Sequence, residues 1–169
     1  MLNSTEQEFF EKLNLITERS EWLESSRDFI DSPHLDETHR LVFHQCWTIF
    51  GHRIREQVND DELLLGLLRC MFPVRSFSQL TLYRGENLDR LNSGRVGFCW
   101  TTDISIADMF AKGLNSICSG GATLKHTFPG SAILAGPSPH STYLGESEYT
   151  VNTKGLEVFE VVSYFPQLK

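Results

Sequence analysis

The sequence predicts an α+β protein in which a helical N-terminal half packs on a mainly antiparallel β-sheet. Two observations carry this prediction. Apolar residues recur every three or four positions up to about residue 75, and from about residue 77 short alternating or β-branched runs are separated by turns. Few helical patterns lie between the predicted strands, which favours antiparallel pairing. We therefore expect a helical region over 1–75 and a β-rich region over 76–169, packed as one compact unit.

Four helices are expected in the first region, because polar capping residues stand where its amphipathic segments begin. Phe9, Phe10 and Trp22 are interpreted as the core of a helical bundle. The alternative is that they form an exposed surface for a protein partner such as an inhibitor. The expected helices are one capped by Ser4 or Thr5, one ending at Asp31-Ser32-Pro33, one over 36–57, and one over 62–71 that is capped by Asn59 or Asp60 and stopped by Pro73.

The sequence of the β-rich region predicts several strands and one short helix. β-Branched and aromatic residues favour strands, and Gly, Pro and Ser mark the turns. The expected strands are 79–84, 97–102, 122–128, 131–135, 148–151 and 156–164, with a helix over 105–112 and a loop rich in Gly and Ser over 116–121.

Composition excludes several classes of function. Apolar residues make up 40% of the 169 residues, which is enough for a buried core, and the net charge of −7 argues against a non-specific nucleic-acid binder. No stretch approaches the roughly 20 apolar residues of a membrane span, and the N-terminus does not resemble a secretory signal. The cysteines and histidines show neither a disulfide framework nor metal-ligand spacing. We therefore expect a cytoplasmic protein with no metal, no membrane association and buried or semi-buried thiols at Cys46, Cys70, Cys99 and Cys118.

The first of three motifs that could carry chemistry is Tyr83-Arg84-Gly85, at the end of a predicted strand. The planar guanidinium of Arg84 matches phosphate oxygens bidentately. Gly85 would let the backbone approach a ligand closely. Taken alone, the motif is more typical of an edge-strand arginine in a surface salt bridge.

The second and third motifs are Trp100-Thr101-Thr102 and Glu146-Ser147-Glu148. Threonine hydroxyls at a strand end can hydrogen-bond a ribose or orient a carboxylate, although threonine is also common in ordinary strands. Carboxylates at i and i+2 point to the same side of an extended segment. One could stabilise an oxocarbenium-like ribose while the other accepts a proton from a nucleophile. Alone, the acidic pair is more typical of a solvated surface.

The order of the three motifs resembles the Arg–Ser/Thr–Glu class of ADP-ribosyltransferases over residues 80–162, about half of the chain. The resemblance implies a split β-sheet and makes 76–169 the NAD-binding catalytic region. It identifies Arg84 as the NAD-binding arginine and Glu148 as the catalytic glutamate, with Glu146 as the upstream acidic residue. The loop over 113–121 would lie near the nicotinamide.

Within this resemblance, residues 100–102 correspond to the Ser-Thr-Ser motif of the family. Trp100 replaces the first serine, so either Thr101 or Thr102 supplies the hydroxyl that orients the catalytic glutamate. The cofactor-binding set is completed by residues beside the motifs or on the following helix, namely Tyr83, Gly85, Trp100 and Phe110.

The resemblance implies a mono-ADP-ribosyltransferase that uses NAD as a substrate and needs no metal. The expected acceptor is a macromolecule, either a protein side chain such as arginine or a nucleic acid. A toxin, a toxin–antitoxin component, and a phage or defence effector are the expected biological settings. Two alternatives remain open: an NAD glycohydrolase with water as acceptor, and a non-catalytic NAD-binding or interaction module.

Overall fold

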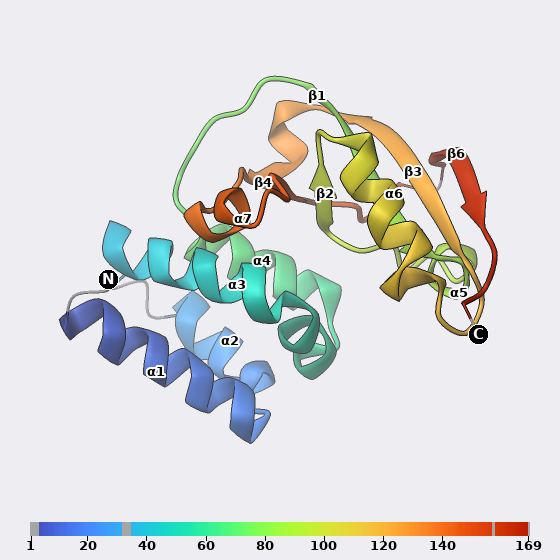
Figure 1. Cartoon of the computed structure of the whole chain (residues 1–169). Coiled ribbons are helices and arrows are strands. Elements are labelled where there is room, and N and C mark those ends of the chain that lie inside the picture. The colour runs from blue at the N-terminus through green and yellow to red at the C-terminus, as the bar shows by residue number, and fades with distance from the viewer. Residues whose placement is uncertain (1–3, 32–34, 157, 169) are drawn as a thin grey trace. The chain divides into compact units, whose positions relative to one another are not determined.

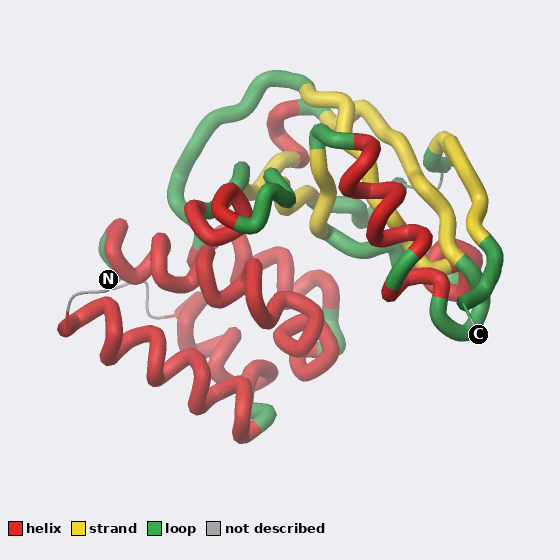
Figure 2. Tube along the Cα trace, viewed as in Figure 1, coloured by secondary structure: helices red, strands yellow, loops and turns green. Residues whose placement is uncertain are grey.

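The computed structural model describes residues 4–31, 35–156 and 158–168, and its secondary structure is that of an α+β protein (Figure 1). Helices predominate in the first part of the chain and strands in the second, as predicted (Figure 2). Across the described residues, no helix combines the length and the apolar composition that crossing a membrane requires.

The described residues form two compact units. The first, called the helical unit, contains the described residues up to Arg75 together with Ser138–His140. The second, called the sheet unit, contains Ser76–Pro137 and the described residues from Ser141 onward. All three candidate motifs lie in the sheet unit.

The helical unit consists of four helices whose ends follow from capping residues. Asp60 is the N-cap of the fourth helix, where its carboxylate accepts hydrogen bonds from the backbone N–H groups of Glu62 and Leu63. Asn59 ends the preceding helix in the left-handed conformation, with φ of 46°. The predicted stop at Ser32-Pro33 lies outside the described residues. The helices are α1 (Ser4–Arg19), α2 (Trp22–Asp31), α3 (Glu37–Val58) and α4 (Asp61–Met71).

The aromatic residues of this unit form its core, as predicted for Phe9 and Trp22. Trp22 is fully buried, and its indole N–H donates a hydrogen bond of 2.9 Å to the Thr17 hydroxyl. Phe9 is buried with its ring at right angles to that of Phe29, and Phe10 is half-buried. The alternative of an exposed partner-binding surface is therefore wrong for Phe9 and Trp22.

The sheet unit contains one six-stranded sheet in the order β4-β5-β2-β1-β3-β6, and every pair of neighbouring strands is antiparallel. The predicted antiparallel character is thus confirmed. The strands are β1 (Leu80–Asn87), β2 (Cys99–Thr101), β3 (Gly121–Phe128), β4 (Ile133–Ala135), β5 (Glu148–Val151) and β6 (Glu160–Phe165).

The two faces of this sheet have different coverings. One face carries a hydrophobic core that includes Leu82, Trp100 and Leu124, and is called the core face. Side chains alternate along a strand, so Gly85 points to the opposite face, on which helix α6 (Ile104–Lys112) packs (Figure 1). A Cβ at Gly85 would lie 2.5 Å from the backbone nitrogen of Ala111. The absence of a side chain there is therefore what allows α6 to approach the sheet.

Several short elements were not predicted. They are the helices α5 (Leu88–Asn92) and α7 (Pro139–Tyr143) and the 3-10 turns η1 (Leu114–Ser116) and η2 (Gly130–Ala132). Each lies in a segment that lacks the repeated apolar spacing from which helices are predicted. The predicted strand over 97–102 is shorter than expected, because only three residues of it pair as β2.

Candidate active site

The sheet order brings the three predicted motifs onto adjacent strands. β1 carries Arg84, β2 carries Thr101 and β5 carries Glu148, and β2 pairs with both of the others. Tyr83 lies opposite Thr101, and Thr101 lies opposite Glu148. Residues that pair directly across strands share a face of the sheet, so these three side chains form one row on the α6 face. Residues that lie as far apart in the sequence as Tyr83 and Glu148 therefore meet at one place.

Arg84 is the next residue along β1, so alternation directs it to the core face. Its Nε donates to Glu86 Oε2 at 2.7 Å, and its Nη1 donates to the Cys99 carbonyl oxygen at 2.6 Å. Of the Arg84 side chain 13% is exposed, whereas the Glu86 side chain is wholly buried. The guanidinium is held in one orientation by two partners.

Glu86 is satisfied on both of its carboxylate oxygens. Oε2 also accepts from the Gly97 N–H at 2.8 Å, and Oε1 accepts from the Asn87 N–H at 2.9 Å. Burial raises the pKa of Glu86, but Arg84 and these two N–H donors outweigh it and leave the pKa below its ordinary value. Burial lowers the pKa of Arg84, and Glu86, with smaller contributions from Cys99 and Glu148, raises it above the ordinary value. The pair is therefore ionised throughout the neutral pH range.

The pKa of Glu148 is raised above its ordinary value, whereas that of Glu86 is lowered. Burial is the main cause that raises the pKa of Glu148, and the nearby Glu146 carboxylate adds to it. Hydrogen bonding with the Cys99 thiol and the attraction of Arg84 lower the pKa, and the net value is about 7. Its backbone N–H donates to the Ser141 hydroxyl at 2.7 Å, which fixes the start of β5. A carboxyl group that titrates near neutrality beside a permanent cation is typical of catalytic sites.

The expected geometry of the acidic pair is wrong in one respect. Glu146 lies in the loop before β5, and Ser147 has a φ of 46°, in the left-handed region. The segment is therefore not extended, so the two carboxylates do not share a side through strand alternation. They remain close enough for Glu146 to raise the pKa of Glu148.

The two threonines differ in their surroundings. Thr101 is buried, and its hydroxyl oxygen accepts a hydrogen bond of 3.2 Å from the Asp103 backbone N–H at the start of α6. Thr102 follows the strand and is exposed. Thr101 is thus the one that lies in the row with Glu148.

Two of the expected cofactor-binding residues have structural roles instead. Trp100 is 1% exposed, its ring lies 4.9 Å from that of Phe128, and its indole N–H donates to the Gly97 carbonyl. No part of the ring is accessible to a ligand. Gly85 packs under α6, where Phe110 is its half-buried neighbour, so its lack of a Cβ serves helix packing rather than the approach of a ligand. Tyr83 is half-buried.

Sequence reasoning missed three residues that the structure adds to the site: Glu86, Cys99 and Ser141. The spacing of Arg84 and Glu86, two positions apart on one strand, was a usable signal for an ion pair on one face. No local pattern marks Cys99 or Ser141, because their contacts depend on the pairing of β2 with β5 and on α7. The prediction of buried or semi-buried thiols is confirmed for Cys46, Cys70 and Cys99, but Cys118 is exposed.

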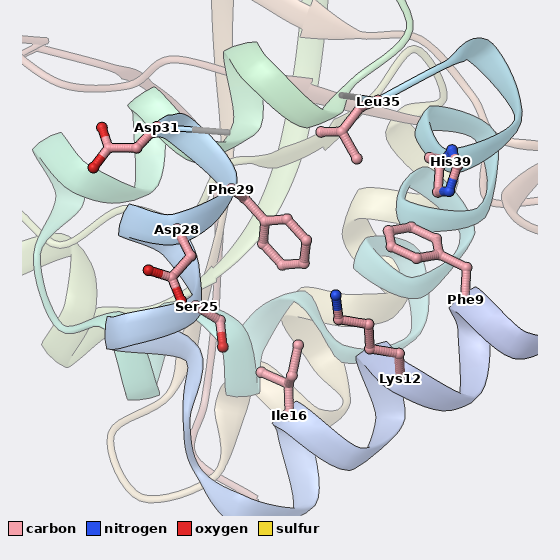
Figure 3. Close-up of a pocket in the computed structure, with 9 residues that line it drawn as sticks. All are labelled: Phe9, Lys12, Ile16, Ser25, Asp28, Phe29, Asp31, Leu35 and His39. Carbon is pink, nitrogen blue, oxygen red and sulfur yellow. The ribbon is translucent and has the colours of Figure 1, made fainter. Parts of the chain in front are cut away.

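A pocket of about 530 Å³ is lined entirely by residues of the helical unit. Figure 3 shows Phe9, Phe29 and Lys12 among its lining side chains. The Lys12 ammonium lies 5.5 Å from the centre of the Phe29 ring, a cation–π contact. None of the candidate site residues lines this pocket. Among the described residues, no group of histidine, cysteine or acidic side chains could hold a metal ion.

Comparison with known proteins finds no counterpart. No family model matches the chain, and neither the curated proteins nor the solved structures contain a match. The interpretation of the site therefore rests on its own geometry and charge.

Proposed function

We propose that this chain is a mono-ADP-ribosyltransferase that cleaves NAD at the bond between nicotinamide and ribose and transfers ADP-ribose to a macromolecular acceptor. One observation carries the proposal: three adjacent strands bring together the buried Arg84 cation and a Glu148 carboxyl whose pKa is about 7. The same three strands carry the motifs that resemble the Arg–Ser/Thr–Glu class.

Glu148 would act in its ionised form. Departure of nicotinamide leaves positive charge on the ribose, and a carboxylate fixed beside that carbon stabilises it. Nicotinamide is already cationic in NAD and leaves without a strong acid. Because the pKa of Glu148 is about 7, the rate should rise as pH increases through neutrality.

Arg84 would supply the positive charge that attracts the NAD phosphates. Its orientation is fixed by Glu86 and the Cys99 carbonyl, so the guanidinium is pre-organised rather than ordered upon binding. Although Arg84 and Glu148 leave their strands on opposite faces of the sheet, each shifts the pKa of the other, and one NAD molecule would contact both charges with its ribose at Glu148.

Glu146 would receive the proton from the acceptor nucleophile. It lies in the loop before β5, outside the strand ladder, where an incoming macromolecule can reach it. A protein side chain, arginine in particular, and a nucleic acid are the two acceptor classes proposed. A cytoplasmic toxin, or a phage or defence effector with an inhibitor protein as partner, is the biological setting that fits such an activity.

The test is incubation of the full chain with NAD labelled on the adenine side, in the presence of cell lysate and RNA. Label retained on a macromolecule supports the transferase. Nicotinamide release with all label recovered as free ADP-ribose supports the alternative of an NAD glycohydrolase. NAD binding without turnover supports a non-catalytic module and contradicts the proposal.

A further inference from the structure

We propose that Ser141 is the residue that positions the acidic pair, holding Glu146 through its main chain and Glu148 through its hydroxyl. The inference rests on the proposed function, since it names the residue that orients the two proposed catalytic carboxylates. Ser141 is a positioning residue, because it acts on the substrate only through Glu146 and Glu148. It belongs to α7 and to the sheet unit, and it is fully buried.

The end of α7 shows how the main chain of Ser141 holds Glu146. Gly145 has a φ of 74°, in the left-handed region, and its N–H donates to the Thr142 carbonyl oxygen at 3.1 Å. The Glu146 N–H donates to the Ser141 carbonyl oxygen at 3.0 Å. These two hydrogen bonds around a left-handed glycine form a Schellman motif, a common termination of helices. The motif fixes the backbone of Glu146 relative to α7.

The register of β5 directs the Glu148 N–H away from β2. In an antiparallel pair of strands, positions that exchange backbone hydrogen bonds alternate with positions that do not. The Val151 N–H donates to the Phe98 carbonyl oxygen at 2.8 Å, so this position is of the first kind. Glu148 stands three positions before Val151, so its pairing with Thr101 is of the second kind. The acceptor for the Glu148 N–H therefore lies on the other side of β5, where β4 pairs.

The Ser141 hydroxyl supplies that acceptor. Strand β4 ends at Ala135, which lies opposite Thr150 and so stops two residues short of Glu148. The Ser141 hydroxyl oxygen accepts from the Glu148 N–H at 2.7 Å, in the place of a carbonyl oxygen from a longer β4. Loss of this acceptor would leave a half-buried N–H without its partner, so the bond holds the start of β5 in place. The direction of the Glu148 side chain follows from the backbone that the bond fixes.

The test measures kcat and KM for nicotinamide release by the wild-type chain, Ser141→Ala and Ser141→Cys. Ser141→Ala loses the hydroxyl but keeps the main-chain bond to Glu146, so kcat should fall by about ten- to hundredfold as Glu148 is displaced. KM for NAD should stay within about twofold, because the phosphate-binding part of the site is untouched. Ser141→Cys should lie between the two, because sulfur is a weak acceptor. The matched control is Ser26→Ala, which removes another buried hydroxyl, a donor to the Trp22 carbonyl oxygen, and should leave kcat unchanged.

A kcat for Ser141→Ala within about twofold of the wild type, or an equal loss of kcat in Ser26→Ala, would overturn the inference. If Ser141→Ala does not fold, the comparison of Ser141→Cys with the wild type decides alone. If the wild type releases no nicotinamide, the proposed function fails, and the role of Ser141 is judged separately by amide hydrogen exchange. Exchange at Glu148 that is faster by about tenfold in Ser141→Ala, with Glu146 as protected as in the wild type, would support the two separate holds. Equal changes at both amides, or no change at either, would refute them.

Discussion

Glu148 is expected to destabilise the fold at neutral and alkaline pH, so replacing it should stabilise the protein while abolishing activity. Its pKa rises from 4.5 to about 7 on folding. Between these values the folded chain binds more protons than the unfolded chain, so the free energy of unfolding falls as pH rises. At about 1.36 kcal/mol per pH unit, the full difference is roughly 3.4 kcal/mol. Since Glu148 is only half-buried, we expect about 1–3 kcal/mol from Glu148→Gln at pH 8.

The assay is urea unfolding of the wild type and Glu148→Gln at pH 4 and pH 8, followed by circular dichroism. At pH 4 the carboxyl group is largely protonated in both states, and the two proteins should differ by less than about 0.5 kcal/mol. Glu24→Gln, which removes the same charge from the exposed surface of α2, should show no pH-dependent gain. A stability difference between wild type and Glu148→Gln that is the same at both pH values would refute the assignment of a raised pKa.

Three further predictions address the other parts of the site. Arg84→Lys keeps the charge but loses the planar fork, so calorimetry should show NAD binding weakened by about tenfold or more, and an unchanged Kd would contradict the phosphate-binding role. Gly85→Ala should lower the free energy of unfolding by about 2–4 kcal/mol, because the new methyl group overlaps the Ala107 carbonyl oxygen of α6, and urea midpoints equal to wild type would show that the helix can move at little cost. Glu146→Gln should reduce transfer to the acceptor more than it reduces NAD hydrolysis, and equal losses in both assays would remove its separate role.

The local elements could be predicted because their signals are local. Helix α4 is bounded by Asp60 and the turn before Pro73, and an apolar stripe lies between them, so its position follows from capping and periodicity. Strand β5 was predicted at its observed bounds, since β-branched residues there follow a turn. The short helices α5 and α7 have too few residues for a periodic pattern to be recognised.

The site was predicted in part, because its motifs are local but its contacts are not. The pairing of β5 with β2 brings together residues about fifty positions apart, and no pattern in the sequence predicts which strands pair. Trp100 was assigned to the cofactor because it lies within a motif. In the structure its large apolar ring is buried in the core, where removal of its surface from water stabilises the fold. The spacing of Arg84 and Glu86 indicates only that the two side chains share a face, and it does not show that the Glu86 side chain is wholly buried and therefore needs a charged partner.

The most direct test of the central claim is nicotinamide release from NAD by the purified full chain, measured beside Glu148→Gln. We predict release by the wild type that increases as pH rises through about 7, and release by the variant reduced to background, with both proteins folded and both binding NAD. No release by the wild type in the presence of protein and RNA acceptors, or equal release by the two proteins, would contradict the assignment of Glu148 as the catalytic carboxylate of an NAD-cleaving enzyme.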